Sequence, residues 1–466
     1  MDLDAVMLAR IQFAFTIAFH IIFPAFTIGL SAWIATLLIM WVRTDNERYR
    51  QLARFWTKIF AVSFAMGVVS GIVLSYQFGT NWSRYSEVVG NVIGPLIGYE
   101  VLTAFFLEAT FLGVLLFGWD RVPRWLHLTA AMCIALGTLM SAFWILSANS
   151  WMHSPAGHVM RDGIAYPDDW WAIVFNPTFG YRLAHMVIAA YLTTAFVVIA
   201  VGARYLLAGV HREQASTMLR MGLGMAIILA PTQAIVGDYH GLKTLQYQPE
   251  KIAAIEGHWE TKPGPLPLVV FAIPSEAQER NLYPVEIPWL GSLILTHSLE
   301  GTYPALKEFP PEDRPPVLLP FYGFRLMVGI GFVFIGLAAW GCWLWWRGRL
   351  EASAWFLRAA AVSWPLGFIA ILAGWTVTEV GRQPWVANGI LRTADAASPV
   401  SASAVATTLA LFVVIYTIVF SAGIYYINRL IVRGPQPPST SRPTGVANRP
   451  LTGAGREGPD PIAETS

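Results

Sequence analysis

The chain has 466 residues, of which 55% are hydrophobic and only 13% are charged. Soluble domains carry roughly a quarter of charged residues, so this composition excludes an ordinary water-soluble globular protein and indicates a polytopic membrane protein. The formal net charge of +2 arises from basic residues that are spread over many short segments. A nucleic-acid-binding patch is therefore not predicted.

Apolar runs of the length that spans a bilayer as a helix recur along the chain. The sequence predicts an all-α membrane helical bundle of about nine transmembrane helices. The predicted spans are 11–41, 60–78, 96–119, 126–147, 184–207, 219–236, 321–346, 356–378 and 405–427.

Lysine and arginine residues accumulate in the odd-numbered loops and after the last span. Because basic loops stay in the cytoplasm, the N-terminus is predicted outside and the C-terminus inside. The predicted organisation has spans one to six in 1–236, an extracytoplasmic loop in 237–320, spans seven to nine in 321–430 and a disordered cytoplasmic tail in 431–466. Cys133 and Cys342 lie inside spans without metal-ligand spacing, so both are predicted to be packing residues.

Three ionisable residues lie inside the early spans. His20 in span one is about 15 Å deep by helix rise, and it either ligates a cofactor or hydrogen-bonds a neighbouring helix. Glu100 and Glu108 in span three lie about 80° apart around the helix and about 12 Å apart along it, so they share a face. Two such carboxylates suggest a proton relay or cation ligands, unless each pairs with a polar group of a neighbouring helix. Ser141 and Asn149 in span four are weaker polar candidates.

His185 in span five and Met327 in span seven lie at one predicted depth, about one turn below the outer surface. Methionine in a span usually fills the core, but an imidazole and a thioether at one level can ligate a six-coordinate haem. The histidines outside the spans or at a span edge are not assigned as ligands: His127, His153, His158, His211, His240, His258 and His297.

Span eight ends in the segment LAGWTVTEVGRQPW (372–385), which contains Glu379 and, three residues later, Arg382. A carboxylate near the end of a span is costly and indicates a functional site, unless it reaches out to the interface. The Gly-Trp and Gly-Arg-Gln-Pro-Trp elements of this segment resemble subunit I of the cytochrome bd family of quinol oxidases. The segments 10–24, 77–82, 182–185 and 324–327 resemble that family in the same order, and the resemblance covers about residues 1–430.

The resemblance implies a terminal quinol:dioxygen oxidoreductase, an electrogenic enzyme that reduces oxygen to water without pumping protons. His20 and Glu379 would hold a haem pair, and the sequence does not decide which of them carries the oxygen-binding haem. A low-spin haem b would lie between His185 and Met327. The other predicted cofactor-binding residues lie near these ligands: Arg325, Trp375 and Arg382.

The long segment 238–316 has no evident regular structure, and its part from 237 to 260 resembles the family's quinol-binding loop. By that resemblance Lys251 and Glu256 serve quinol oxidation, since a carboxylate next to a cation can accept a proton from the quinol. The loop lacks a long insertion and resembles the short-loop branch, which includes cyanide-insensitive oxidases. The implied cofactors are a low-spin haem b, a high-spin haem b, and either haem d or a third haem b.

The family also implies a bacterial inner-membrane location, a subunit II and a small single-span subunit, besides quinol, dioxygen and membrane lipid. Protons taken up from inside would pass Glu108, the deeper carboxylate, with Thr110, Ser141 or water completing the route, while Glu100 would lie beside the haem pair.

Two rival hypotheses stay open. One is a proton-coupled transporter without haem, which also needs buried ionisable residues, and the other is a haem-bearing electron-transfer subunit of a dehydrogenase.

Overall fold

A computed structural model describes residues 4–261 and 264–436 of the chain. Within these ranges, eight helical runs are long and apolar enough to cross a membrane, and a bent helix pair makes a ninth. The predicted all-α membrane bundle is therefore confirmed. The predicted tail from residue 437 onward lies outside the described residues, whereas the last span continues as helix to Arg433.

The nine runs follow the chain as single helices or as consecutive helical pieces. They are α1 (Ala5–Thr44), α2 (Glu47–Thr80), α3 (Ser83–Glu100) with η1 (Val101–Phe105) and α4 (Phe106–Phe117), α5 (Arg124–His153), α6 (Trp170–Val174) with α7 (Phe179–Ala208), α8 (Arg212–Tyr247), α11 (Leu318–Trp346), α12 (Ala354–Val362) with α13 (Leu366–Val380), and α14 (Ala402–Arg433).

Two of these runs are irregular in ways that the apolar pattern does not reveal. The run from α3 to α4 contains a π-helical segment, η1, which widens the helix between Glu100 and Glu108. The pair α12 and α13 is bent by 41° at a short break that contains Pro365. Proline has no backbone N–H to donate and disfavours helical conformation in the residue before it, so the break is expected at this position.

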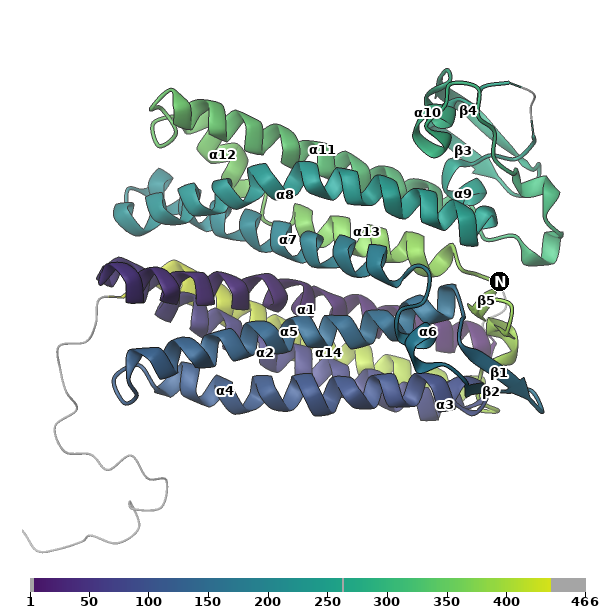
Figure 1. The fold of residues 1–466 in the computed structure, drawn as a ribbon, viewed down its shortest axis with the longest axis horizontal. Helices are drawn as coiled ribbons and strands as arrows, with labels where there is room; N and C mark the ends of the chain where they lie inside the picture. Colours follow the sequence, from purple (N-terminus) through teal and green to yellow (C-terminus); the bar gives the residue numbers. More distant parts are fainter. Residues whose placement is uncertain (1–3, 262–263, 437–466) are drawn as a thin grey trace, which may run out of the picture. The chain divides into compact units, whose positions relative to one another are not determined.

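The helices form two groups that meet along their long sides (Figure 1). One group contains α7, α8, α11, α12 and α13, and the other contains α1, α2, α3, α4, α5 and α14. At their boundary α1 contacts α7 and α13, and α5 contacts α7. A glycine permits this approach: a Cβ atom on Gly29 of α1 would lie 2.7 Å from Thr194 Cβ of α7. Within the first group, a Cβ atom on Gly367 of α13 would lie 2.8 Å from Thr193 Cα of α7. Such close packing is what associates helices in lipid, where apolar burial alone gives little gain.

The segment between α8 and α11 is structured, contrary to the expectation from its sequence. α8 continues to Tyr247, well beyond the predicted end of span six, and leads into the short helix α9 (Pro249–Glu256). An antiparallel hairpin of β3 (Leu268–Ser275) and β4 (Arg280–Ile287) follows, and then α10 (Leu290–Thr296) with the 3-10 turns η2 (Leu306–Glu308) and η3 (Pro311–Asp313). Ala253 and Ala254 of α9 pack with Val269 of β3 and Phe321 of α11, which anchors the segment on the bundle.

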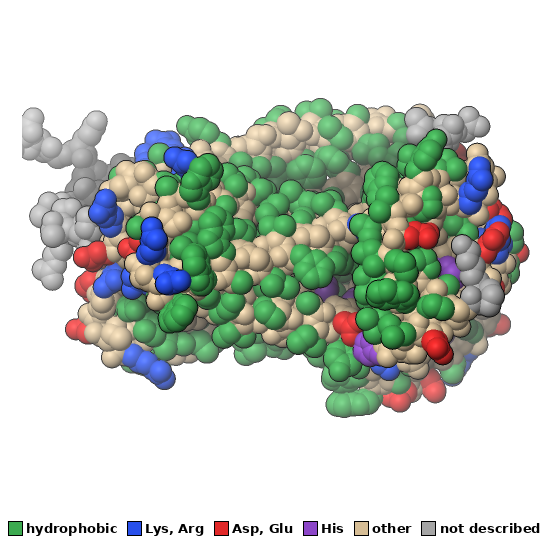
Figure 2. Space-filling view, turned by 90° about the horizontal axis from the view of Figure 1, so that it is seen from above, with side chains coloured by type: hydrophobic (Ala, Val, Ile, Leu, Met, Phe, Trp, Pro, Cys, Tyr) green, Lys and Arg blue, Asp and Glu red, His purple; other side chains and the backbone are tan. Residues whose placement is uncertain are grey.

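The remaining strands pair within two small hairpins. β1 (His158–Arg161) pairs with β2 (Ile164–Pro167), and β5 (Trp385–Ala387) pairs with β6 (Leu391–Arg392), which leads into the turn η4 (Thr393–Asp395). On the face shown in Figure 2, Lys and Arg side chains gather at one end, hydrophobic side chains cover the middle, and acidic and histidine side chains gather mainly at the other end. This asymmetry is the pattern on which the predicted orientation rests.

Candidate functional site

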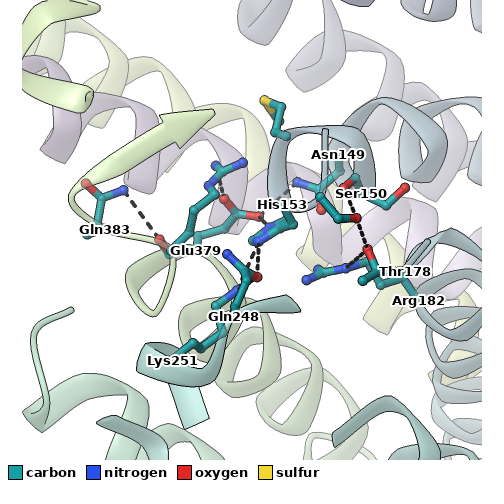
Figure 3. A network of polar contacts seen from close by, with 12 residues as sticks. Asn149, Ser150, His153, Thr178, Arg182, Gln248, Lys251, Glu379 and Gln383 are labelled. Atoms are coloured by element: carbon teal, nitrogen blue, oxygen red, sulfur yellow. Dashed lines mark hydrogen bonds and ion pairs between the residues drawn. The ribbon is translucent and has the colours of Figure 1, made fainter. Parts of the chain in front are cut away.

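Glu379, near the end of α13, lies in a buried polar network between the two helix groups (Figure 3). Arg382 donates a hydrogen bond to Glu379 Oε2, and Asn149 Nδ2 of α5 donates to Oε1 at 2.9 Å. His153 Nε2, one turn further along α5, lies 3.5 Å from the same Oε1 atom. The carboxylate is therefore held by groups on its own segment and on α5, and it does not extend to the interface as the simpler alternative required.

Lys251 connects α9 to this network from the other side of the imidazole. Its Nζ lies 3.0 Å from His153 Nδ1 and donates to Gln248 Oε1 at 2.6 Å. His153 Nδ1 is also 3.1 Å from Gln248 Oε1. Lys251 is only 2% exposed and His153 is fully buried, so this contact fixes the loop helix to the end of α5.

The pKa of Lys251 lies well below the ordinary value for lysine. Burial is the largest cause, because it penalises the ammonium form. The nearby guanidinium groups of Arg182 and Arg382 lower the pKa further, and the carboxylates of Glu379 and Glu250 oppose them. The ammonium form of Lys251 is therefore disfavoured at this position.

Buried cations outnumber carboxylates in this network. Arg182, Lys251 and Arg382 are all at least 93% buried, and Glu379 is the carboxylate among them. Within the described chain, Arg382 Nε and Nη1 are buried and have no hydrogen-bond partner. Since unpaired buried guanidinium atoms are costly, the network fits an additional anionic group such as a haem propionate.

Glu256 lies on a different side of α9 from Lys251, because five residues turn a helix by roughly 140°. Its nearest cation is Arg325 of α11, whose Nη2 is 3.6 Å from Glu256 Oε2. Arg325 also donates to the carbonyls of Val269 and Ile255, each at 2.8 Å. The sequence placed Glu256 beside Lys251, whereas the structure pairs it with Arg325.

Glu256 is a buried carboxyl group with an unusual environment. Burial raises the pKa of Glu256, and the neighbouring Arg325 guanidinium opposes this shift. Its Oε2 atom accepts no hydrogen bond from any described residue. A carboxyl group with a raised pKa and a free oxygen is suited to exchanging a proton with a ligand.

His185 and Met327 lie in the same helix group and each faces a glycine of a neighbouring helix. His185 Nε2 is 3.2 Å from Gln233 Nε2 of α8, and its buried Nδ1 has no partner among the described residues. A Cβ atom on Gly237 of α8 would lie 3.3 Å from the imidazole. A Cβ atom on Gly374 of α13 would lie 2.8 Å from Met327 Sδ. A substituent at either glycine would crowd the candidate ligand.

His20 of α1 has a comparable environment on the other side of the group boundary. Its Nδ1 is 2.9 Å from Ser70 Oγ of α2, and a Cβ atom on Gly71 would lie 3.1 Å from the ring. A hydrogen bond at one ring nitrogen orients the other toward a metal, which is the usual arrangement of ligating histidines. The next residue, Ile21, belongs to one packed cluster with Ile371 and Trp375 of α13, the helix that carries Glu379.

Glu100 and Glu108 both face α5, as their predicted common face requires. Ser141 Oγ donates to Glu100 Oε1 at 2.8 Å, and a Cβ atom on Gly137 would lie 2.7 Å from Glu108 Cγ. Of the two hydroxyl residues predicted to continue the proton route from Glu108, Ser141 hydrogen-bonds Glu100 instead. The other, Thr110, is exposed on the bundle surface. Glu108 Oε1 is buried without a hydrogen-bond partner in the described part of the chain.

Three residues of the central network were not predicted to be functional: His153, Gln248 and Arg182. One signal was available for His153, because Asn149 and His153 are four residues apart and share a helix face. Gln248 could not be placed from sequence, since its partner lies 95 positions away. Arg182, at the start of the segment 182–185, is buried, and its Nε donates to Thr178 Oγ1 at 3.3 Å.

These environments fit haem as a cofactor. His20, His185 and Met327 each face a glycine of a neighbouring helix. One ring nitrogen of His20 lies within hydrogen-bond distance of Ser70, and one ring nitrogen of His185 has no partner among the described residues. Arg382 has buried N–H groups without a partner in the described chain. Among the residues that the structure describes, no three His, Cys, Asp or Glu side chains converge to hold a bare metal ion. The candidates occur singly or in pairs, as axial ligands of a macrocycle do.

Comparisons with known proteins agree with this assignment. A family model described as cytochrome bd terminal oxidase subunit I matches residues 8–435. The chain is similar to cytochrome bd-II ubiquinol oxidase subunit 1 of Escherichia coli (strain K12), with 34% identity over 95% of this chain and 99% of that protein. It is also similar to cytochrome bd ubiquinol oxidase subunit 1 of Bacillus subtilis (strain 168), with 35% identity over 93% and 95% of the two chains.

A solved structure of bd oxidase from Geobacillus thermodenitrificans is similar to the whole bundle. The TM-score is 0.86 at 33% identity, and the match covers 93% of this chain and 99% of that chain. The chain therefore belongs to the cytochrome bd terminal oxidase subunit I family and is a multi-pass protein of the bacterial inner membrane.

Proposed function

We propose that this chain is the haem-bearing subunit of a terminal oxidase that oxidises quinol at the segment between α8 and α11. The observation that supports it best is the buried contact of Lys251 with His153 beside Glu379, because it joins the predicted quinol loop to a predicted haem ligand. Membership of an oxidase family argues against the two rival hypotheses, a transporter and a subunit of a dehydrogenase.

His185 and Met327 are the residues that would hold a low-spin haem b within the group of α7, α8, α11 and α13. His20 and Glu379 would each hold a high-spin haem, with Trp375 and Arg382 beside them. Bound haem iron transfers single electrons and binds dioxygen, which the side chains of this chain cannot do. The contribution of the protein is to fix the ligands and to neutralise the propionates, for which Arg382 has free N–H groups.

Quinol oxidation releases two electrons and two protons, so the site needs a proton acceptor. Glu256 is suited to this role because its raised pKa lies closer to neutral pH than that of an ordinary carboxyl group. Arg325, at 3.6 Å, stabilises the carboxylate form that accepts the proton. Lys251 is then a positioning residue that holds α9 against α5, with His153 and Gln248 as its partners.

Reduction of oxygen to water consumes protons on the side of the haem pair. Glu108 and Glu100, which both face α5, would carry these protons from the cytoplasmic side, with Ser141 serving Glu100. The absence of a long insertion in the loop supports the short-loop branch, with a third haem b or a haem d as the remaining cofactor. A subunit II and a small single-span subunit would complete the enzyme.

Quinol-driven oxygen uptake by the purified complex tests this function. Four electrons reduce one dioxygen to two waters, so two quinols should be oxidised for each dioxygen consumed. A ratio of one quinol for each dioxygen would indicate peroxide as the product. Quinol oxidation without oxygen uptake would contradict the oxidase function.

A further inference from the structure

A groove lies at the end of the bundle that is rich in basic residues, where α11 ends and the chain turns into α12. It encloses about 610 Å³, which is the size of a small-molecule site. Its lining residues come from the last turns of α11, the connecting turn and the start of α12: Trp340, Trp343, Leu344, Arg347, Arg349, Ala352, Ser353, Ala354 and Trp355. The groove is therefore both aromatic and cationic.

The two arginines of the groove have no carboxylate partner in the described chain. Arg347 and Arg349 flank Gly348, whose φ of 67° turns the chain out of α11. The neighbouring acid, Glu351, is already engaged, because Arg220 donates to it at 2.7 Å and Ser216 at 2.5 Å. Two unpaired guanidinium groups in one groove favour an anionic ligand.

Tryptophan side chains form the walls around these charges. The Arg347 guanidinium lies 5.6 Å from the ring centre of Trp343, within cation–π distance. Trp343 is 50% exposed and Trp355 is 75% exposed, while Trp340 packs edge-on against the buried Phe356. Exposed tryptophans at the end of a membrane helix lie at the level of the lipid headgroups.

We propose that this groove binds the phosphate headgroup of an anionic phospholipid. Arg347 and Arg349 would bind the phosphate, and the exposed tryptophans would contact the glycerol and the first part of the acyl chains. A phospholipid is favoured over a free phosphate because α11, which lines the groove, also exposes the apolar side chains of Phe332 and Val333 further along the helix. Figure 2 shows Lys and Arg side chains next to hydrophobic ones at the basic end of the bundle.

The groove is remote from the residues proposed to hold haem. Met327 and Trp346 lie on the same helix, about 28 Å apart by helix rise. The proposed lipid site therefore does not depend on the proposed function, and a variant that no longer binds the lipid should keep its haem spectrum.

Lipid binding by the purified, delipidated oxidase complex tests the inference. Phosphatidylglycerol should raise the thermal midpoint of the wild type, and phosphatidylcholine should not. The Arg347→Ala/Arg349→Ala variant should lose this shift and should bind phosphatidylglycerol at least about tenfold more weakly, since charged hydrogen bonds are lost. The matched control Arg43→Ala/Arg121→Ala removes two exposed arginines from other basic loops and should keep the shift.

Three outcomes would overturn the inference. One is an unchanged phosphatidylglycerol shift in the Arg347→Ala/Arg349→Ala variant. Another is an equal loss in the control variant, which would indicate a diffuse charge effect. The third is an equal shift with glycerol phosphate or inorganic phosphate, which would indicate a site for soluble anions. If the double variant fails to fold, as judged by its haem spectrum, the single variants Arg347→Ala and Arg349→Ala replace it.

Discussion

Lys251 Nζ on α9 lies 3.0 Å from His153 Nδ1 at the end of α5, although the two residues are 98 positions apart. Both side chains are almost completely buried. A buried amine in such a place is stabilised by its few hydrogen-bond partners, so removal of one partner should be costly. The segment between α8 and α11 and the end of α5 are thus one structural unit.

We predict that His153 and Lys251 are energetically coupled. His153→Leu leaves the buried Lys251 Nζ with Gln248 as its remaining close partner, so this variant should be destabilised. Lys251→Met in the same background should restore part of the loss, with a coupling of about 0.5–3 kcal/mol. Unfolding of the purified complex, followed for the two single variants and the double variant, measures this coupling.

A second pair provides the control for that cycle. Lys307 lies on the surface and pairs with Glu260 at 2.5 Å, away from the network. The changes in unfolding free energy caused by Lys307→Met and by His153→Leu should add in the double variant. Additive effects for His153 and Lys251 as well would mean that their contact contributes nothing to stability.

Glu256 should give quinol oxidation a dependence on pH. Its pKa is raised by burial, and the carboxylate form accepts the proton. Quinol-driven oxygen uptake should therefore rise as the pH increases through the raised pKa. Glu256→Gln should be slow and should lack this rise, whereas Glu260→Gln, in the same loop, should keep it.

The raised pKa of Glu256 also affects stability, which should fall as the pH rises, whereas the activity should increase. Because the pKa of Glu256 is higher in the folded state than in the unfolded state, its contribution to stability is present at low pH and is lost as the pH rises through the folded value. Glu256→Gln should thus gain stability relative to the wild type above that pH. If Glu256→Gln has no relative gain and also keeps the pH profile of the wild type, the raised pKa is wrong.

Met327 is predicted to be an axial ligand. Met327→Leu keeps the volume of the side chain but removes the thioether, so the low-spin haem absorption should disappear while high-spin haem stays. Met218→Leu, a fully buried methionine of α8, is the matched control and should keep the full spectrum. An intact low-spin band in Met327→Leu would assign the ligand elsewhere.

Glu108 is predicted to carry protons to the haem pair. Glu108→Gln keeps the shape of the side chain and its fit against Gly137 but cannot release a proton, so turnover should fall and proteoliposomes should build a smaller membrane potential. Haem content should change little. Glu87→Gln, an exposed residue of α3 paired with Arg84, should behave as the wild type, and normal turnover in Glu108→Gln would exclude the proposed route.

The spans could be predicted from sequence because each is a long apolar run, a property that needs no knowledge of neighbours. The bend before Pro365 and the π-helical segment next to Glu100 could not, since both depend on how single turns adapt to packing. The hairpin of β3 and β4 was not predicted, because each strand contains a proline, which argues against a strand in a sequence. These errors leave the span order intact.

The candidate site could be predicted only where one residue carries the signal alone. Glu379 is a carboxylate at the end of an apolar run, and its cost is visible from its position. His153 gave little such signal, because its partners are Lys251 and Glu379, which lie 98 and 226 positions away. The pairing of Glu256 with Arg325 likewise required the fold, since sequence proximity favoured Lys251.

The most direct test is the absorption spectrum of the purified complex, recorded first without oxygen after addition of quinol and again after oxygen is admitted. Bound haem should be reduced by the quinol, with the low-spin b absorption prominent, and admission of oxygen should reoxidise it. A protein without haem absorption, or with haem that quinol reduces but oxygen does not reoxidise, would contradict a quinol oxidase whose haems are held by His20, His185, Met327 and Glu379.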